Sequence, residues 1–197
     1  LATALWHERY QGEPSPEVEA IAAAHRYDLY VLCGIDVPYE HDGVRFLHLD
    51  TPWVQGAMLI REPRVIVLEY VQRMMAWLLF VPAPSVAGRH AMQLGLGAGS
   101  ITKFCYKKLR MTCTAVEINA RVADVCRAWL RLPPEDERLR VVIADAAREV
   151  RRAEWLGTVD ALQVDLYDDE AAAPVLDSPD FYADCRSLLT DDGAMTV

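Results

Sequence analysis

The sequence predicts an α/β protein whose main domain is a doubly wound, mostly parallel sheet. From residue 90 onward, five strand-like apolar runs alternate with helical runs, as in proteins whose parallel strands are joined by crossover helices. The first of these runs leads into a glycine-rich segment, "LGLGAGS", and acidic residues end the next three. Because ligands of such sheets bind at the carboxyl ends of the strands, the two observations together predict a binding site at that edge.

Residues 1–62 are expected to form a smaller domain with a helix and a small antiparallel sheet. Ser15 can cap a helix that begins at Pro16. Three strand-like runs follow, and their short, turn-rich connections favour an antiparallel meander over a strand–helix–strand unit. These runs are residues 29–36, 44–50 and 54–60.

Residues 63–197 are expected to form a Rossmann-like nucleoside-binding domain. Helical spacing over residues 64–80 predicts its first helix, which ends before "VPAPS". The predicted strands are residues 89–96, 111–118, 139–145, 158–167 and 193–197, and the predicted helices between them are 99–109, 120–132, 146–155 and 180–189. Because the chain starts without Met and stops at Val197 in a strand-like run, we expect a fragment that is truncated at its C-terminal end.

The glycine spacing restricts the ligand. Gly95, Gly97 and Gly99 form G-x-G-x-G, and Ser100 stands where a dinucleotide loop would have its third glycine. No Lys-Ser/Thr pair follows, which disfavours a P-loop. A tight strand-to-helix turn without a ligand is the alternative that the glycines alone leave open.

Carboxylates at the strand ends favour a nucleoside. Glu117 ends the second strand, about 20 residues after the glycines, where an acid can accept both hydroxyls of a ribose. Asp145 ends the third strand and can accept a hydrogen bond from an adenine amino group, cap the next helix, or do both. Asp165 and Asp168 follow the fourth strand and form either a substrate site or a solvated acidic loop.

Composition and charge limit the possible partners. The net charge of −9 argues against nucleic-acid binding through a basic face and is compatible with a small cationic substrate. No uncharged apolar run is long enough to span a membrane, and the scattered histidines show no metal-ligand spacing. Cysteines without C-x-x-C indicate thiols in a reducing compartment, hence a cytoplasmic protein. They are Cys33, Cys105, Cys113, Cys126 and Cys185.

Several motifs, in order along the chain, resemble those of one family. They are "FLHLDTPWVQGAMLIREP", "MQLGLGAGSITKF", "AVEINARV", "LRVVIADAAREV", "VDALQVDLYDD" and "SPDFYADCRSLLTDDGAMTV". From about residue 43 to the end, the chain resembles the spermidine synthase (polyamine aminopropyltransferase) family. That family is a branch of the class I S-adenosylmethionine-dependent methyltransferase superfamily.

The resemblance implies a transferase that uses decarboxylated S-adenosylmethionine, or S-adenosylmethionine, as co-substrate, acts on a small cationic amine and needs no metal. The small antiparallel sheet and an edge strand lead us to expect a homodimer. It implies donor binding by Gln55, Gly95, Gly97, Gly99, Glu117 and Asp145, with Glu117 on the ribose and Asp145 on the adenine. It implies acceptor binding by Tyr70 and Asp168, and a catalytic role for Asp165, which would orient the amine and remove its proton.

The chain also departs from the family pattern. Ala98 stands where the family loop carries an Asp that helps to bind the donor's amine, and the segment after the fourth strand reads Asp-Leu-Tyr-Asp-Asp. Two alternatives to aminopropyl transfer therefore stay open. One is an S-adenosylmethionine-dependent methyltransferase of unknown acceptor, and the other is a non-catalytic protein that kept the fold.

Overall fold

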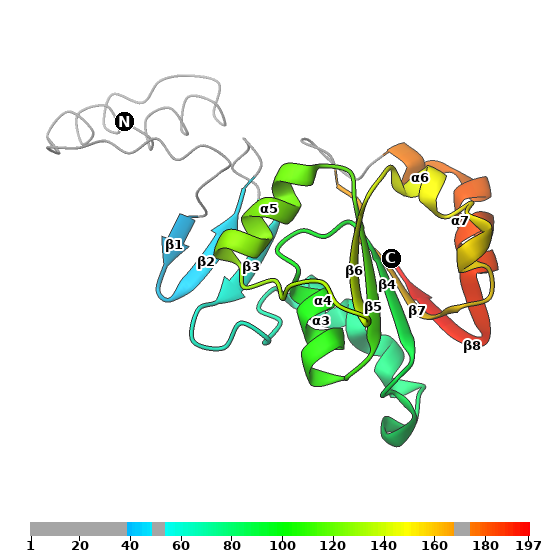
Figure 1. Cartoon of the computed structure of the whole chain (residues 1–197), viewed down its shortest axis with the longest axis horizontal. Helices are drawn as coiled ribbons and strands as arrows, with labels where there is room; N and C mark the ends of the chain where they lie inside the picture. Colours follow the sequence, from blue (N-terminus) through cyan, green and yellow to red (C-terminus); the bar gives the residue numbers. More distant parts are fainter. Residues whose placement is uncertain (1–38, 49–53, 168–173) are drawn as a thin grey trace, which may run out of the picture. The chain divides into compact units, whose positions relative to one another are not determined.

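The computed structural model of the chain describes residues 39–48, 54–167 and 174–197, which carry two β-sheets (Figure 1). The helix predicted after Ser15 and the strand predicted at residues 29–36 lie outside the described residues. The chain divides into one unit of residues 1–32 and a second unit of residues 33–197. All described residues belong to the second unit.

The larger sheet confirms the predicted fold class. Its five strands are parallel and lie in the order β6-β5-β4-β7-β8. They are β4 (His90–Leu94), β5 (Thr112–Glu117), β6 (Leu139–Ile143), β7 (Val159–Val164) and β8 (Leu189–Thr196). From β4 the chain builds outward through β5 and β6, then returns to the other side of β4 for β7 and β8. The strand order reverses beside β4, and such switch points bind ligands in doubly wound sheets.

Helices pack on both faces of this sheet, as Figure 1 shows for α3 and α4 on one side and α6 and α7 on the other. Alternate residues of β4 point to opposite faces. Ala91 packs with α3, α4 and the turns that follow them, whereas Met92 and Leu94 pack with α7. The helices are α3 (Glu69–Met74), α4 (Ser100–Lys103), α5 (Ala120–Trp129), α6 (Ala146–Glu149) and α7 (Pro179–Leu188). Shorter turns are η1 (Met75–Leu79), η2 (Ala83–Ser85), η3 (Phe104–Lys108), η4 (Ala153–Trp155) and η5 (Pro174–Asp177).

Local sequence explains where the longer helices begin. The Asn119 side chain accepts a hydrogen bond from the backbone N–H of Arg121 (3.0 Å) at the start of α5. Ser178 caps α7, accepting from the N–H of Phe181 (3.4 Å), and Pro179 occupies the first helical position. These signals can be read in the sequence, and both helices begin within one residue of their predicted starts.

The smaller sheet is an antiparallel meander of β1 (Tyr39–His41), β2 (Val44–Leu47) and β3 (Gly56–Leu59). It contacts the glycine loop directly. The Ser100 hydroxyl donates to the Ala57 carbonyl (3.0 Å), and a Cβ on Gly56 would lie 2.5 Å from the Ala98 Cβ. This contact brings Gln55, immediately before β3, to the carboxyl edge of the larger sheet.

Four predicted boundaries were wrong. The helix expected over residues 146–155 ends at Glu149, and Ala153–Trp155 form the separate turn η4. Residues 37–43 were expected as a turn, but only Asp42 and Gly43 turn, both at positive φ, and Tyr39–His41 pair with β2. The helix expected over residues 64–80 begins at Glu69. Residues 65–68 are not helical, and Gln72 Nε2 donates to the Ile66 carbonyl (2.9 Å). The strand expected from residue 193 begins at Leu189 and bulges against β7.

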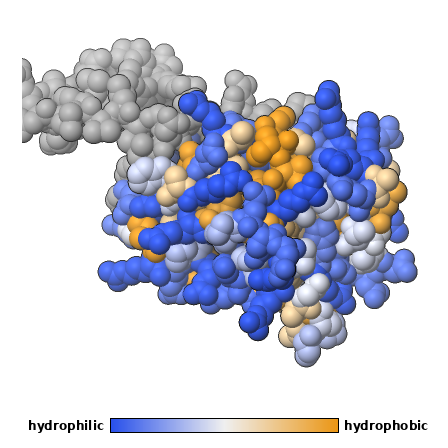
Figure 2. Space-filling model, in the orientation of Figure 1, coloured by the Kyte–Doolittle hydropathy of each residue, from blue (hydrophilic) through white to orange (hydrophobic). Residues whose placement is uncertain are grey.

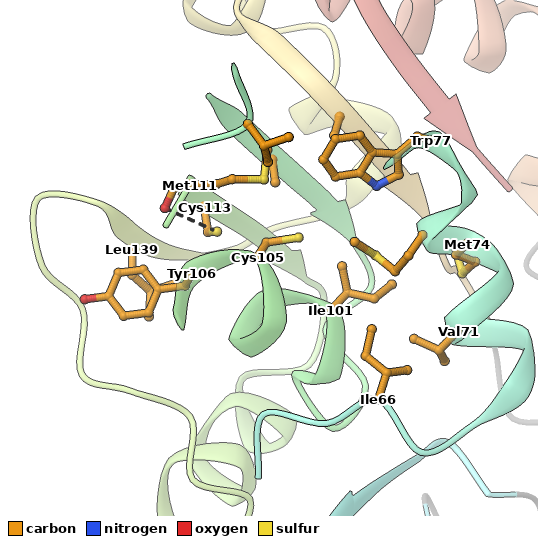
Figure 3. Packing of buried hydrophobic residues seen from close by; sticks show 14 residues of the cluster. Ile66, Val71, Met74, Trp77, Ile101, Cys105, Tyr106, Met111, Cys113 and Leu139 are labelled. Atoms are coloured by element: carbon orange, nitrogen blue, oxygen red, sulfur yellow. Dashed lines mark hydrogen bonds between the residues drawn. The ribbon is translucent and has the colours of Figure 1, made fainter. Parts of the chain in front are cut away.

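One buried cluster fixes the position of α3 against the sheet (Figure 3). Val71, Met74 and Trp77 come from α3 and η1 and pack with Ile101 and Cys105 from α4 and η3. All five are at most 7% exposed. Burial of each large apolar side chain contributes about 1.5–3 kcal/mol to folding, so α3 cannot move from the sheet without losing several such contributions.

The face drawn in Figure 2 is mostly polar, and the described cysteines are free thiols. Figure 2 shows polar residues over most of one face, with hydrophobic residues in separate groups. Among the described helices, none has the length and apolar character that a membrane span requires. The four cysteines within the described ranges are free and buried, and Cys33 lies outside them.

Lys103 is a cation inside the core. Its side chain is 1% exposed, and Nζ donates to the Leu130 carbonyl (2.6 Å) at the end of α5. Burial lowers the pKa of this amine from 10.5 to about 8, against a smaller opposing effect of Cys126. The folded chain therefore holds the charged form of Lys103 less well than the unfolded chain does.

We expect the stability difference between the wild type and Lys103→Met to depend on pH. Since the folded-state pKa is depressed, the contribution of Lys103 is full above pH 10.5 and is lost as the pH falls through 8. The free energy of unfolding of the wild type, relative to that of the variant, should therefore rise by about 2 kcal/mol between pH 7.5 and 9.5. Urea unfolding at the two pH values measures this, and exposed Lys108→Met is the control. A difference independent of pH would mean that the Lys103 pKa is not shifted.

Candidate functional site

A hollow of about 290 Å³ lies where β4, β5, β6 and β7 end. Each of these strands contributes a predicted residue to its lining, namely Gly95, Glu117, Asp145 and Asp165. Gln55 and Tyr70 also line it. Residues from six parts of the sequence thus meet at one edge of the sheet, as the strand ends predicted.

The glycine loop needs its glycines for close approach. Gly95 has φ of +87°, and a Cβ there would lie 2.0 Å from the Asp165 carbonyl oxygen. Gly97 has φ of +50°, and its Cβ would lie 2.9 Å from the Gln55 carbonyl oxygen. Gly99 precedes α4 as its N-cap and is not part of the hollow's lining, so its contribution here is to the turn.

Glu117 is held in place by the backbone. Its side chain is buried, Oε2 accepts from the Leu96 N–H (3.0 Å) and Oε1 accepts from the Asn119 N–H (2.9 Å). Each carboxylate oxygen can accept more than one hydrogen bond. Glu117 is therefore a rigid acceptor at the hollow, suited to a pair of hydroxyl groups.

Asp145 caps α6 and also lines the hollow. Oδ1 accepts from the backbone N–H groups of Ala147 (2.7 Å) and Arg148 (3.3 Å). Both of these bonds end on the same oxygen. The capping role expected from the sequence is thus present, and it does not prevent Asp145 from contacting a ligand through Oδ2.

The fold changes the acidity of Asp165. Burial raises its pKa from 3.8 to about 6, and a hydrogen bond from the Tyr70 hydroxyl to Oδ2 (3.4 Å) acts in the opposite direction. Burial and the negative charge of Asp165 raise the pKa of Tyr70 well above its ordinary value. Tyr70 therefore remains a neutral donor, whereas Asp165 can exchange a proton near neutral pH.

A second hollow of about 400 Å³ adjoins the first. The two share four lining residues: Tyr70, Asp165, Leu166 and Tyr167. Asp165 thus lies between two spaces, each large enough for part of a small ligand. Such a carboxylate can act on a proton of one bound molecule while it contacts another.

Two exposed lining residues, Ile118 and Tyr167, were not predicted from the sequence. Ile118 is 72% exposed directly after Glu117, and Tyr167 is 58% exposed between two acids. A large apolar or aromatic residue within two positions after a strand-ending acid is the signal that could have found them. Asp168, predicted to bind the acceptor, lies outside the described residues. Ala98 is buried against Gly56.

The parallel five-stranded sheet, with carboxylates at the ends of three of its strands, has a methyltransferase-like α/β fold. The solved structure of human methyltransferase-like protein 13 in complex with SAH superposes with a TM-score of 0.57 at 23% identity, covering 66% of this chain and 64% of that one. A probable spermidine synthase from Corynebacterium glutamicum gives 0.64 at 16% identity, covering 78% of this chain and 55% of that one. At these identities the likeness concerns the fold alone.

Sequence comparison then identifies the family. The model described as "Spermine/spermidine synthase domain" matches residues 71–197. A polyamine aminopropyltransferase from Neisseria meningitidis is 36% identical over 155 residues, which is 78% of this chain and 57% of the relative. One from Chromobacterium violaceum is 35% identical over 159 residues, 80% of this chain and 59% of the relative. The chain belongs to the spermine/spermidine synthase family, and it spans a little more than half the length of these relatives.

A second family model, described as "AAA domain", matches residues 1–62. Most of that range lies outside the described residues, and the described part forms β1, β2 and β3. Residues 1–62 contain no lysine, so they lack the Gly-Lys-Ser/Thr sequence of a P-loop. The predicted boundary at residue 62 remains a prediction.

We expect Asp165→Asn to stabilise the chain at neutral pH. Because the folded-state pKa is raised, the contribution of Asp165 to stability is full below pH 3.8 and is lost as the pH rises through 6. The neutral amide avoids this cost, so the free energy of unfolding of the variant should exceed that of the wild type by about 3 kcal/mol at pH 7.5 and by about 1 kcal/mol at pH 4.5.

Urea unfolding at the two pH values measures this difference. Asp124→Asn, whose side chain is 74% exposed on α5, is the matched control. If Asp165→Asn were destabilising to the same extent at both pH values, the carboxylate would have an ordinary pKa in the folded chain.

Proposed function

We propose that this chain is a transferase that moves an aminopropyl group from decarboxylated S-adenosylmethionine to a polyamine or diamine acceptor. The charge of the first hollow carries this proposal. Its charged lining residues are Glu117, Asp145 and Asp165, and none of its described lining residues is Lys, Arg or His. The decarboxylated donor has a sulfonium and an ammonium group and no carboxylate, so its charge complements these acids. The family to which the chain belongs supports the same reaction.

The same charge disfavours the two alternatives. S-adenosylmethionine has a carboxylate, which would enter an acidic hollow with no described cation to pair with it. A non-catalytic protein, for its part, has no use for a carboxylate that burial holds at a pKa of about 6. Aminopropyl transfer is therefore favoured over methyl transfer and over binding alone.

In the proposed complex, the nucleoside part of the donor lies in the first hollow. Glu117 accepts hydrogen bonds from the ribose hydroxyls, and Asp145 accepts one from the adenine amino group. Gly95 and Gly97 let the backbone approach the donor, and Gln55 covers it from the smaller sheet. Gly99 supports this site through the turn that it caps.

In the proposed reaction, the acceptor lies on the second-hollow side of Asp165. The amine nitrogen attacks the methylene carbon bonded to the sulfonium, the C–S bond breaks, and its electron pair stays on sulfur to give methylthioadenosine. The proton lost by the amine passes to the carboxylate of Asp165. The Tyr70 hydroxyl donates a hydrogen bond to Asp165 Oδ2 and orients the carboxylate. Asp168 is proposed to bind a further cationic group of the acceptor. No step needs a metal.

The proposal includes a homodimer in the cytoplasm. Free, buried thiols at the four described cysteines are compatible with a reducing compartment.

Calorimetric titration of the chain with three nucleosides tests the proposal. Decarboxylated S-adenosylmethionine should bind at least tenfold more tightly than S-adenosylmethionine, and methylthioadenosine should also bind. Glu117→Gln should weaken all three by about 10- to 100-fold, because hydrogen bonds to a charged acceptor contribute about 1.5–3 kcal/mol. Exposed Glu137→Gln, which lines neither hollow, is the control.

Each other result of this titration supports a different function. A preference for S-adenosylmethionine would support methyl transfer. Failure of a folded chain to bind any of the three nucleosides would contradict both transferase functions and leave the non-catalytic protein.

A further inference from the structure

The C-terminal end of α5 accepts hydrogen bonds from two basic side chains of other segments. Arg45 Nη1, from β2, donates to the Trp129 carbonyl (2.5 Å), and Lys103 Nζ, from α4, donates to the Leu130 carbonyl (2.6 Å). The last carbonyls of a helix have no partner within the helix and carry a partial negative charge, so they favour cationic donors. The end of α5 therefore connects the smaller sheet with the helix that follows the glycine loop.

The guanidinium of Arg45 is held on several sides. Besides its bond to the Trp129 carbonyl, Nη2 contacts Glu40 Oε2 (3.1 Å), and the guanidinium carbon lies 5.8 Å from the centroid of the Trp129 ring. The side chain is 20% exposed. Glu40 belongs to the same small sheet as Arg45, so the contact with Trp129 is the one that joins this sheet to α5.

Arg45 lies on the face of the smaller sheet that packs on α5. Residues two apart in a strand share a face, and so do residues paired across two strands. Arg45 and Leu47 therefore share a face with their partners on β3, Met58 and Gly56. Leu47 and Met58 are 1% exposed in a cluster with residues of α5 and the glycine loop, and Gly56 lies against Ala98 of that loop.

This packing also places Gln55. Its backbone N–H donates to the Leu47 carbonyl (2.8 Å), and its own carbonyl lies where a Cβ on Gly97 would be 2.9 Å away. Gln55 lines the first hollow from this position. Leu47 is two residues beyond Arg45, which is about 7 Å along a strand. Loss of the Arg45 bond would therefore release one end of the face, while Gly56 at the other end stays against the glycine loop.

We infer that Arg45 is a positioning residue for the proposed donor site. This inference rests on the proposed function, in which the donor binds in the first hollow. Arg45 lines neither hollow, so it acts through the Trp129 carbonyl, which fixes the smaller sheet on α5 and thereby holds Gln55 over the nucleoside. Asp145 is independent of Arg45, because backbone N–H groups of α6 hold its carboxylate.

Two double-mutant cycles test the inference. Arg45→Met keeps the aliphatic part of the side chain and removes its donors, whereas Arg45→Lys keeps the charge. The affinity of the full chain for methylthioadenosine is measured by calorimetry for Arg45→Met, alone and combined with Gln55→Ala or with Asp145→Asn. Arg127→Met is the matched control, because Arg127 lies on α5, pairs with two carboxylates and lines neither hollow.

We expect Arg45→Met to weaken binding about five- to tenfold, as the loss of a hydrogen bond from a charged donor would require. Arg45→Lys, which can still donate to a carbonyl, should stay within about threefold of the wild type. Added to Gln55→Ala, Arg45→Met should change the affinity less than about twofold, because the residue through which it acts is gone. Added to Asp145→Asn, it should have its full effect. Arg127→Met should bind like the wild type.

A merely structural role of Arg45 predicts a different pattern, once urea unfolding has shown that every variant is folded during the titration. Arg45→Met would then weaken binding as much in the Gln55→Ala background as in the Asp145→Asn background. That result would overturn the inference, as would wild-type affinity in Arg45→Met or in Gln55→Ala alone. If the wild type binds methylthioadenosine without the expected pattern, only the role of Arg45 fails. If the folded wild type binds no nucleoside, the proposed function fails and the inference fails with it.

Discussion

The close approach of β4 and β7 at their carboxyl ends is the constraint on which the site depends. Gly95 follows β4 with positive φ. Because it has no side chain, the Asp165 carbonyl oxygen can lie where a Cβ would clash with it. Backbone bonds from Gly95 N to Val116 O (2.8 Å) and from Asp165 N to Leu94 O (2.9 Å) hold three strand ends together. The glycine loop, Glu117 and Asp165 are therefore parts of one rigid edge.

Burial of Asp165 at this edge lowers the stability of the folded chain. Burial of Asp165 raises its pKa to about 6, so the folded chain holds the ionised carboxylate less well than the unfolded chain does. Tyr70 offsets part of this cost through its hydrogen bond. A carboxylate that is costly to ionise is a stronger base than an exposed one, and proton removal from an amine needs such a base. The chain thus gives up stability where the chemistry is proposed.

The sequence predicted the parts of the molecule that depend on local patterns. Alternating strand and helix signals predicted five parallel strands, and α5 and α7 begin within one residue of their predicted starts. The strand-ending positions of Glu117, Asp145 and Asp165 predicted a common edge, because parallel strands all end on the same side of a sheet. Boundaries failed where tertiary packing overrode local preference, as at Ile66, whose carbonyl is bound by the Gln72 side chain.

Only the tertiary structure decided how these residues share the site. It separates Gly99, which shapes the turn, from Gly95 and Gly97, which line the hollow. It gives Asp165 its burial, which no sequence pattern encodes, and it joins Tyr70 of α3 to a strand end almost a hundred residues away. Short-range periodicity in the sequence determines the succession of strands and helices along the chain and which residues end the strands. Proximity, burial and charge balance at the site arise from contacts between distant segments, and these exist only in the folded chain.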